Sequence, residues 1–263
     1  MTPFNSLHRH LLCAVLIGFT LPSHASVEAD MAFALDSIWH MERPSVSLAG
    51  ESFASKTSKA GTSYRAKSNN SPAYLMTGEE SASIEFGRKR FSATESPWGS
   101  FPRLDMEHAR LLELSTPKKR YVALVGPGKG LFSVGDWQRY GFMHVVDITA
   151  RHAPVYYPLF SDAYLGERVL GRLPGSPVLN FARLVPASWA TRAEPSAYEV
   201  SLYALGAKGP ERVIKEGRPL AYVLKRQAGR WSIERTDVTP ATELLDLNKR
   251  AFTAPNLPAV SVR

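Results

Sequence analysis

Alternating apolar and polar positions dominate the second half of the chain and predict strands there. In residues 198–205, Tyr198, Val200, Leu202 and Ala204 alternate with mostly polar neighbours, the pattern of a half-buried strand. Turns rich in Gly, Pro and Asp divide residues 142–235 into two groups of four segments. The segments are 142–148, 155–160, 167–173 and 178–185, followed by 198–205, 211–215, 220–226 and 230–235. This plan predicts a mainly β protein of consecutive antiparallel four-stranded meanders, arranged as a propeller or as a sandwich.

A hairpin is expected just before these groups. Residues 110–114 and 120–126 flank a short polar turn that contains Pro117. Residues 121–125 form an uninterrupted apolar run, which is typical of a strand buried on both faces.

The two ends of the chain follow other patterns. Apolar residues recur at helical spacing before Pro44, which predicts an N-terminal helix over 26–44. Residues 45–100 are rich in Ser, Thr, Gly and Asn, so we expect a polar, partly disordered segment with a long mobile loop over 51–71. A C-terminal helix is expected over 240–252, which places one β-rich domain with this helix in 101–263.

The first 25 residues have the features of a signal peptide. Arg9 precedes a mostly apolar run over 11–21, and Ser23 and Ala25 occupy the positions that signal peptidase reads. The run is shorter than the roughly 20 residues that a membrane span needs. Cys13 is the single cysteine and lies in this segment, so cleavage would remove thiol chemistry. We therefore expect a soluble periplasmic or secreted protein without a membrane span after cleavage.

The charge balance is basic, with 32 Lys and Arg against 24 Asp and Glu. The basic residues are spread along the chain, and only 88–90 and 118–120 form short clusters. Nucleic-acid-binding proteins show a basic stripe, which is not seen here. The excess favours an acidic protein partner or an anionic envelope polymer, and no nucleic acid.

Motifs that would indicate catalysis or a cofactor fail at one or more positions. Ser115 and Lys118 have the S-x-x-K spacing but lie in a predicted turn, and the companion motifs of those enzymes are missing. His144, Asp147 and His152 are weak candidates for a metal site, because strand alternation directs His144 and Asp147 to opposite faces. We predict no catalytic residues and no cofactor.

Aromatic residues are concentrated between Phe132 and Tyr164, which include eight of them. Tyr, Trp and Arg often anchor protein interfaces, although aromatic residues in strands also fill cores. The candidate partner-binding residues in and around this stretch are Trp137, Arg139, Tyr140, Arg151, Tyr156 and Tyr157.

Together these features favour an exported, non-catalytic binding protein over an enzyme. We expect an inhibitor or immunity-type protein that acts on a protein partner in the bacterial envelope, since such a protein needs only a complementary surface. Two alternatives remain: a carbohydrate- or cell-wall-binding module, and a hydrolase whose site assembles only in three dimensions.

Overall fold

A computed structural model describes residues 24–39, 53–65, 72–77, 81–93, 95–100, 103–129, 140–150, 152–191 and 194–236. The protein is mainly β, and every strand pairing is antiparallel within these residues. The elements are α1 (His24–Asp36), β1 (Ala54–Ser58), β2 (Gly61–Arg65), β3 (Ala73–Thr77), β4 (Ser81–Phe86), β5 (Lys89–Ser92), β6 (Glu95–Ser96), β7 (Gly99–Ser100), β8 (Arg103–Leu104), β9 (Arg110–Ser115), β10 (Arg120–Lys129), β11 (Gly141–Asp147), β12 (Val155–Ser161), η2 (Gly166–Val169), β13 (Leu170–Gly171), β14 (Asn180–Trp189), β15 (Pro195–Gly206), β16 (Gly209–Arg212), β17 (Ile214–Lys215), β18 (Arg218–Pro219), β19 (Ala221–Gln227) and β20 (Arg230–Arg235).

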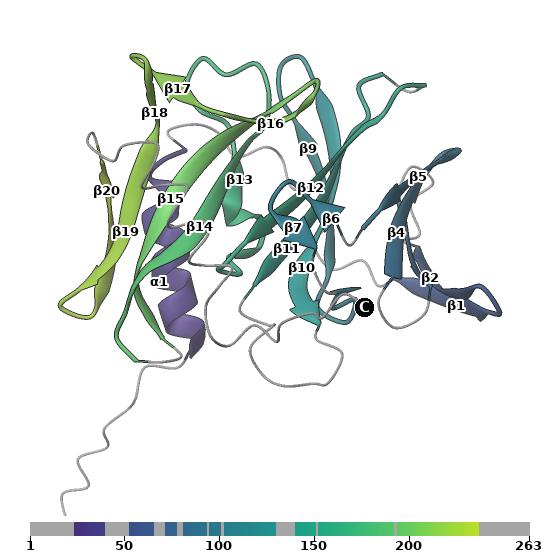
Figure 1. The fold of residues 1–263 in the computed structure, drawn as a ribbon, viewed down its shortest axis with the longest axis horizontal. Coiled ribbons are helices and arrows are strands. Elements are labelled where there is room, and N and C mark those ends of the chain that lie inside the picture. The colour runs from purple at the N-terminus through teal and green to yellow at the C-terminus, as the bar shows by residue number, and fades with distance from the viewer. Residues whose placement is uncertain are drawn as a thin grey trace, which may run out of the picture.

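The three larger sheets of the described residues lie side by side (Figure 1), and the pairs β6-β7 and β17-β18 form two small ones. The first has the order β1-β2-β3-β4-β5, and the middle one joins β12-β11-β10 to β9 and β8. The third has the order β13-β14-β15-β19-β20, with β16 beside β15. Hydrogen bonds connect the end of β12 to β14, since the Asp162 amide donates to the Leu184 carbonyl at 2.9 Å.

The larger core lies between the middle sheet, the third sheet and α1. Its side chains include Leu35 and Trp39 from the N-terminal region, Val145 and Tyr157 from the middle sheet, and Val200 from the third sheet. The indole of Trp39 also donates a hydrogen bond to the Arg168 carbonyl at 2.8 Å. α1 itself packs on β19 and β20 of the third sheet and on η2.

The smaller core lies between the other face of the middle sheet and the β1–β5 sheet. Val122 and Leu124 of β10 face this core, while Ala123 and Val125 face the larger one. The prediction that residues 121–125 are buried on both faces is confirmed, as is the β9–β10 hairpin. Strand alternation between two packed layers explains the unbroken apolar run.

Strand positions after residue 140 agree closely with the sequence pattern, but the expected pairing is not confirmed. β11 and β12 belong to the middle sheet, whereas β13 and β14 belong to the third, so the first group of four is divided between two sheets. Residues 167–173 form the short η2 helix and β13 rather than one strand. Turn residues mark where a strand ends, but they do not specify its partner.

The segment 45–100 differs most from expectation. Strands β1 and β2 form where we expected the long loop over 51–71, and β3–β5 complete a sheet. Gly61 makes this possible, because its φ is +122° and a Cβ there would lie 2.0 Å from the Met76 carbonyl oxygen. Only one face of the sheet packs on the core, which is why these strands carry so many Ser, Thr and Lys residues.

The N-terminal helix was expected over 26–44, and α1 spans His24–Asp36 with a turn at Ser37 and Ile38. The helix expected over 240–252 lies outside the described residues. Among the described residues, no helix has the length and apolar character needed to cross a membrane.

Candidate functional site

The aromatic segment singled out from the sequence is largely core wherever it is described. Trp137, Arg139 and Arg151 lie outside the described residues. Tyr140 is buried and stacks on Phe160, with ring centres 5.6 Å apart. Tyr157 is fully buried, and its hydroxyl donates to the Gly206 carbonyl at 2.9 Å. Tyr140 and Tyr157 are therefore not surface residues, which corrects their assignment to a partner-binding patch.

Tyr156 and His144 form a polar pair inside the smaller core. The Tyr156 hydroxyl and His144 Nδ1 share a hydrogen bond of 2.8 Å, and the Tyr156 ring stacks on Phe91 of β5 at 4.9 Å. Burial lowers the pKa of His144 to about 4 and raises that of Tyr156. Both side chains are neutral near pH 7, so the pair joins the β1–β5 sheet to the middle sheet without a buried charge.

The three weak metal candidates are not brought together. His144 faces the smaller core, while Asp147 accepts a hydrogen bond from Lys119 Nζ at 2.6 Å at the far end of β11. Burial alone would raise the pKa of Asp147, but the hydrogen bonds from Lys119 and Thr149 hold it below its ordinary value. His152 is exposed in a turn. No group of three or more metal-ligating side chains occurs in the part of the chain that the structure describes.

A second polar group, which we call the buried charge cluster, lies on β14–β16 and at the end of β12. It comprises Arg183, Asp162, Glu199, Ser201 and Arg212. Arg183 has no exposed side-chain surface and lies 3.7 Å from Asp162 Oδ2, with its guanidinium 5.2 Å from the centre of the Trp98 ring. Arg183 also lies opposite Ser201 in the β14–β15 register, and Arg212 Nη2 donates to Ser201 Oγ at 2.9 Å.

The buried charge cluster is electrically balanced. Its two guanidinium groups, Arg183 and Arg212, face two carboxyl groups, Asp162 and Glu199. Burial raises the pKa of Glu199 even though Arg212 and Arg183 oppose the shift. A buried ion network of this kind holds a fold in one arrangement, because each charge depends on its neighbours for solvation.

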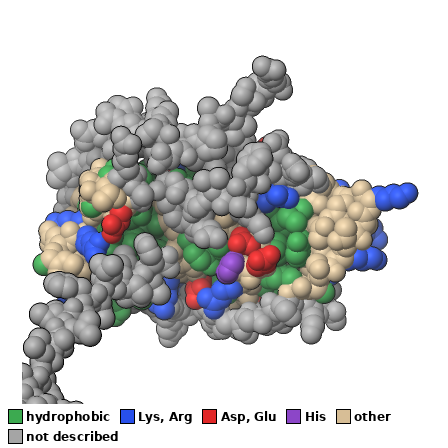
Figure 2. All heavy atoms as spheres, turned by 90° about the horizontal axis from the view of Figure 1, so that it is seen from below, with side chains coloured by type: hydrophobic (Ala, Val, Ile, Leu, Met, Phe, Trp, Pro, Cys, Tyr) green, Lys and Arg blue, Asp and Glu red, His purple; other side chains and the backbone are tan. Residues whose placement is uncertain are grey.

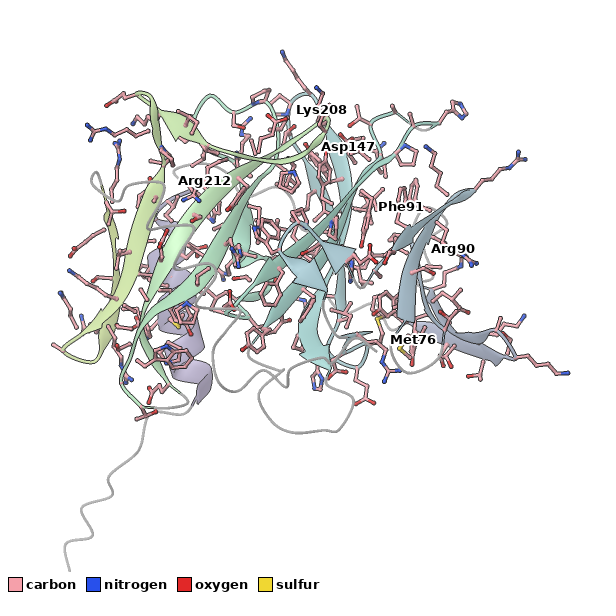
Figure 3. The ribbon with its side chains drawn as sticks, viewed as in Figure 1. Met76, Arg90, Phe91, Asp147, Lys208 and Arg212 are labelled. Carbon is pink, nitrogen blue, oxygen red and sulfur yellow. The ribbon has the colours of Figure 1, made fainter. Side chains whose placement is uncertain are left out.

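The outer face of the β1–β5 sheet has the opposite character. Register places Tyr64, Tyr74 and Ile84 in one row on the inner face, toward the middle sheet. The neighbouring row on the outer face contains Arg65, Glu85 and Arg90. Figure 3 shows the same contrast in β5, where Phe91 points toward the body of the molecule and Arg90 points away from it.

Six exposed basic side chains belong to this sheet and its turns, and we call them the basic face. They are Lys56, Lys59, Arg65, Arg88, Lys89 and Arg90. Lys56, Arg65 and Arg90 lie on the outer face and Lys59 and Arg88 in turns, whereas Lys89 is opposite Phe86 at the end of β5, on the side of Phe91. Figure 2 shows Lys and Arg side chains projecting from this end of the molecule. Glu85 is the single acid among the described residues of the sheet, and Arg90 Nε donates to it at 2.8 Å. Glu79 and Glu80 lie outside the described residues.

The other five side chains of the basic face form no ion pair within the described residues. The sequence contained part of this signal, namely the 88–90 cluster, but the strands that bring Lys56 and Arg65 beside it were expected to be a loop. No family model matches this chain, and no curated protein or solved structure matches it.

Proposed function

We propose that this chain is a non-catalytic binding protein that engages an acidic protein through the basic face. The observation that carries this proposal is the group of five exposed cations without a compensating acid in the described residues. Exposed charges of one sign raise the rate of encounter with an oppositely charged surface and reject partners of like charge.

The sheet supplies a rigid support for such a surface. Its inner face is anchored by Tyr74, whose hydroxyl accepts a hydrogen bond from the Leu104 amide at 2.9 Å. Burial raises the pKa of Tyr74 to about 12, so this hydroxyl stays neutral. The outer face contributes little to the core, so its cations are available for a partner.

We also propose that the protein acts after export, as an inhibitor or immunity-type protein of the bacterial envelope. The order of Arg9, the apolar run over 11–21 and the small residues before Ser26 supports export. N-terminal sequencing of the protein from an envelope fraction is expected to begin at Ser26, and a start at Met1 would count against export.

Charge reversal on the basic face tests the interaction. We call the triple variant with Lys56→Glu, Lys59→Glu and Arg65→Glu the basic-face variant. It is expected to bind the partner at least about tenfold more weakly, because the electrostatic attraction becomes repulsion. The matched control combines Lys208→Glu, Lys215→Glu and Arg230→Glu, which change the net charge equally at exposed positions of another part of the chain. Figure 3 shows Lys208 far from Arg90 in the view drawn.

Affinity capture from an envelope extract, followed by mass spectrometry, compares the three proteins as baits. An acidic protein captured by the wild type and the control, but not by the basic-face variant, supports the proposal. Capture should also fall as salt rises above about 0.15 M, where the Debye length is about 8 Å. Equal capture by all three baits would show that the basic face is not the interface.

If no protein is captured at any salt concentration, the partner is not a protein. Sedimentation with purified peptidoglycan then tests the alternative of an anionic or carbohydrate-containing envelope polymer. If only the proteins with an intact basic face are retained in the pellet, the basic face binds the polymer rather than a protein.

A further inference from the structure

We infer that an acidic, extended segment of the partner adds to the β1–β5 sheet as a strand alongside β1. This inference rests on the proposed function, because it specifies how the basic face holds its partner. β1 is the first strand in the sheet order, and no described strand pairs with its outer side. All five of its residues are exposed.

The β1–β2 register shows which main-chain groups point outward. A two-residue turn joins the strands, so Ser58 and Gly61 form the closing pair, which exchanges hydrogen bonds. Hydrogen-bonded and non-hydrogen-bonded pairs alternate along an antiparallel ladder. The next pair, Thr57 with Thr62, is therefore of the second kind, and so is Ser55 with Tyr64.

Two contacts agree with this assignment. The Thr57 and Thr62 hydroxyls lie 3.2 Å apart, as expected where side chains approach closely in a non-hydrogen-bonded pair. Ser63 Oγ donates to the Lys56 carbonyl at 3.3 Å, so that carbonyl faces β2. The N–H and C=O groups of Ser55 and Thr57 consequently point away from β2, in position to pair with another strand.

β1 lacks two of the features that protect sheet edges, a proline and a bulge, and has a third, a lysine. It has no proline, and its pairing with β2 runs through five consecutive residue pairs without a bulge. Its single edge charge, Lys56, lies at the centre of the strand. Lys56 disfavours a second copy of β1, whose own lysine would lie nearby, and favours an acidic strand instead.

Two further cations near β1 also favour an acidic strand. Lys59 lies in the turn after β1, and Arg65 pairs with Ala54 on the adjoining strand. An added strand with acidic residues on its outer face would meet Lys56 first and Arg65 further across the sheet. Main-chain hydrogen bonds would hold the segment, while these cations would select its charge.

Proline substitution separates strand addition from simple charge attraction. Ser55→Pro and Thr57→Pro each remove an outward N–H group and leave the inward ladder to β2 intact, a position in which edge strands tolerate proline. Ser55→Ala and Thr57→Ala are the matched controls, because they remove the hydroxyl and keep the N–H group. Thermal unfolding of each variant verifies that the fold is retained.

The probe is a synthetic peptide about seven residues long, enough to span β1, in which glutamate alternates with valine and threonine. Each proline variant is expected to bind this peptide about tenfold more weakly than the wild type, and the alanine controls about equally. A peptide of equal charge with proline in place of valine cannot pair and is expected to bind at least about tenfold more weakly to the wild type.

Amide hydrogen exchange gives a second readout that charge attraction would not change. Peptide binding is expected to slow exchange at the Ser55 and Thr57 amides, which point outward. If these amides exchange at the same rate with the peptide present, or if the proline variants bind as well as the wild type, strand addition is overturned.

Binding of polyphosphate separates two negative outcomes: failure of strand addition at β1 alone, and failure of the basic face to bind anions at all. Polyphosphate binding that is lost in the basic-face variant but retained in the proline variants shows that the face attracts anions whatever the peptide result. Absence of binding to both probes would overturn both proposals. Sedimentation experiments also test self-association. If the wild type self-associates and Ser55→Pro abolishes this, a second copy of the chain pairs with β1 and the acidic-segment proposal is overturned.

Discussion

Arginine side chains occupy two contrasting places in this molecule. In the buried charge cluster, Arg183 is completely enclosed and lies beside Asp162, with Glu199 also buried nearby. On the basic face, Arg65 and Arg88 are exposed and have no acidic partner in the described residues. In the third sheet an arginine is therefore buried away from water beside carboxyl groups. In the β1–β5 sheet arginines are exposed to water without a described acidic partner.

The difference follows from the cost of dehydrating a charge. A buried guanidinium needs nearby carboxylates and hydroxyls to replace water, so its charge is committed to the fold. An exposed guanidinium keeps its water and contributes little to folding, so its charge remains available to a partner. Counting arginines cannot separate these roles, whereas burial and neighbouring acids can.

The largest expected effect would come from removing the buried charge. Arg183→Met is expected to lower the free energy of unfolding by about 3–5 kcal/mol, because Asp162 would remain buried without its neighbouring cation. Urea denaturation monitored by tryptophan fluorescence measures this change. The control Arg90→Met removes an exposed cation of the same shape and is expected to cost at most about 1 kcal/mol. Equal losses in the two variants would break the comparison.

An intermediate effect is expected from a buried group that stays neutral. The pKa of His144 is about 4 in the folded protein, below its ordinary value of 6.5, so the unfolded chain binds a proton first as the pH falls. Its contribution to stability is full above pH 6.5 and is lost toward pH 4, a change of about 3 kcal/mol. Urea denaturation across this pH range measures it.

The His144→Gln variant isolates the histidine from other titrating groups. Glutamine can keep a hydrogen bond with Tyr156 but does not titrate, so its stability should change less between pH 6.5 and pH 4. Glu199 acts in the opposite direction, since burial raises its pKa and the folded state therefore holds its proton more tightly. Identical pH profiles for the two proteins would show that His144 does not contribute.

The smallest effect on folding is expected at the single described acid of the basic face. Glu85→Gln removes the ion pair with Arg90 and should change the free energy of unfolding by at most about 1 kcal/mol. The same substitution should strengthen binding of polyphosphate a few-fold, because Arg90 becomes available and an unfavourable acid disappears. Isothermal titration calorimetry measures the affinity, and weaker binding would argue against the role of the basic face.

The strand predictions succeeded and failed for identifiable reasons. β15 alternates clearly because one face packs on the larger core, and β10 is apolar throughout because both faces are covered. β1 and β2 gave no such signal, since Ala54, Ser55, Lys56, Thr57 and Ser58 are all exposed. Aromatic density indicates an interface or a core equally well, and Tyr140 and Tyr157 are core residues, whereas Trp137, Arg139 and Arg151 lie outside the described residues.

The amino-acid sequence by itself determined that the chain is mainly β, where most strands after residue 109 lie, and that its charge balance is basic. These properties depend on local alternation, on turn residues and on composition, which do not require knowledge of distant contacts. Tertiary structure alone decided which strands share a sheet, and it placed Arg183 in a balanced interior and Lys56 and Arg65 on an exposed face. Strand pairing and dehydration depend on residues far apart in the chain, so no local pattern could separate a cation that holds the fold from one that is free to meet a partner.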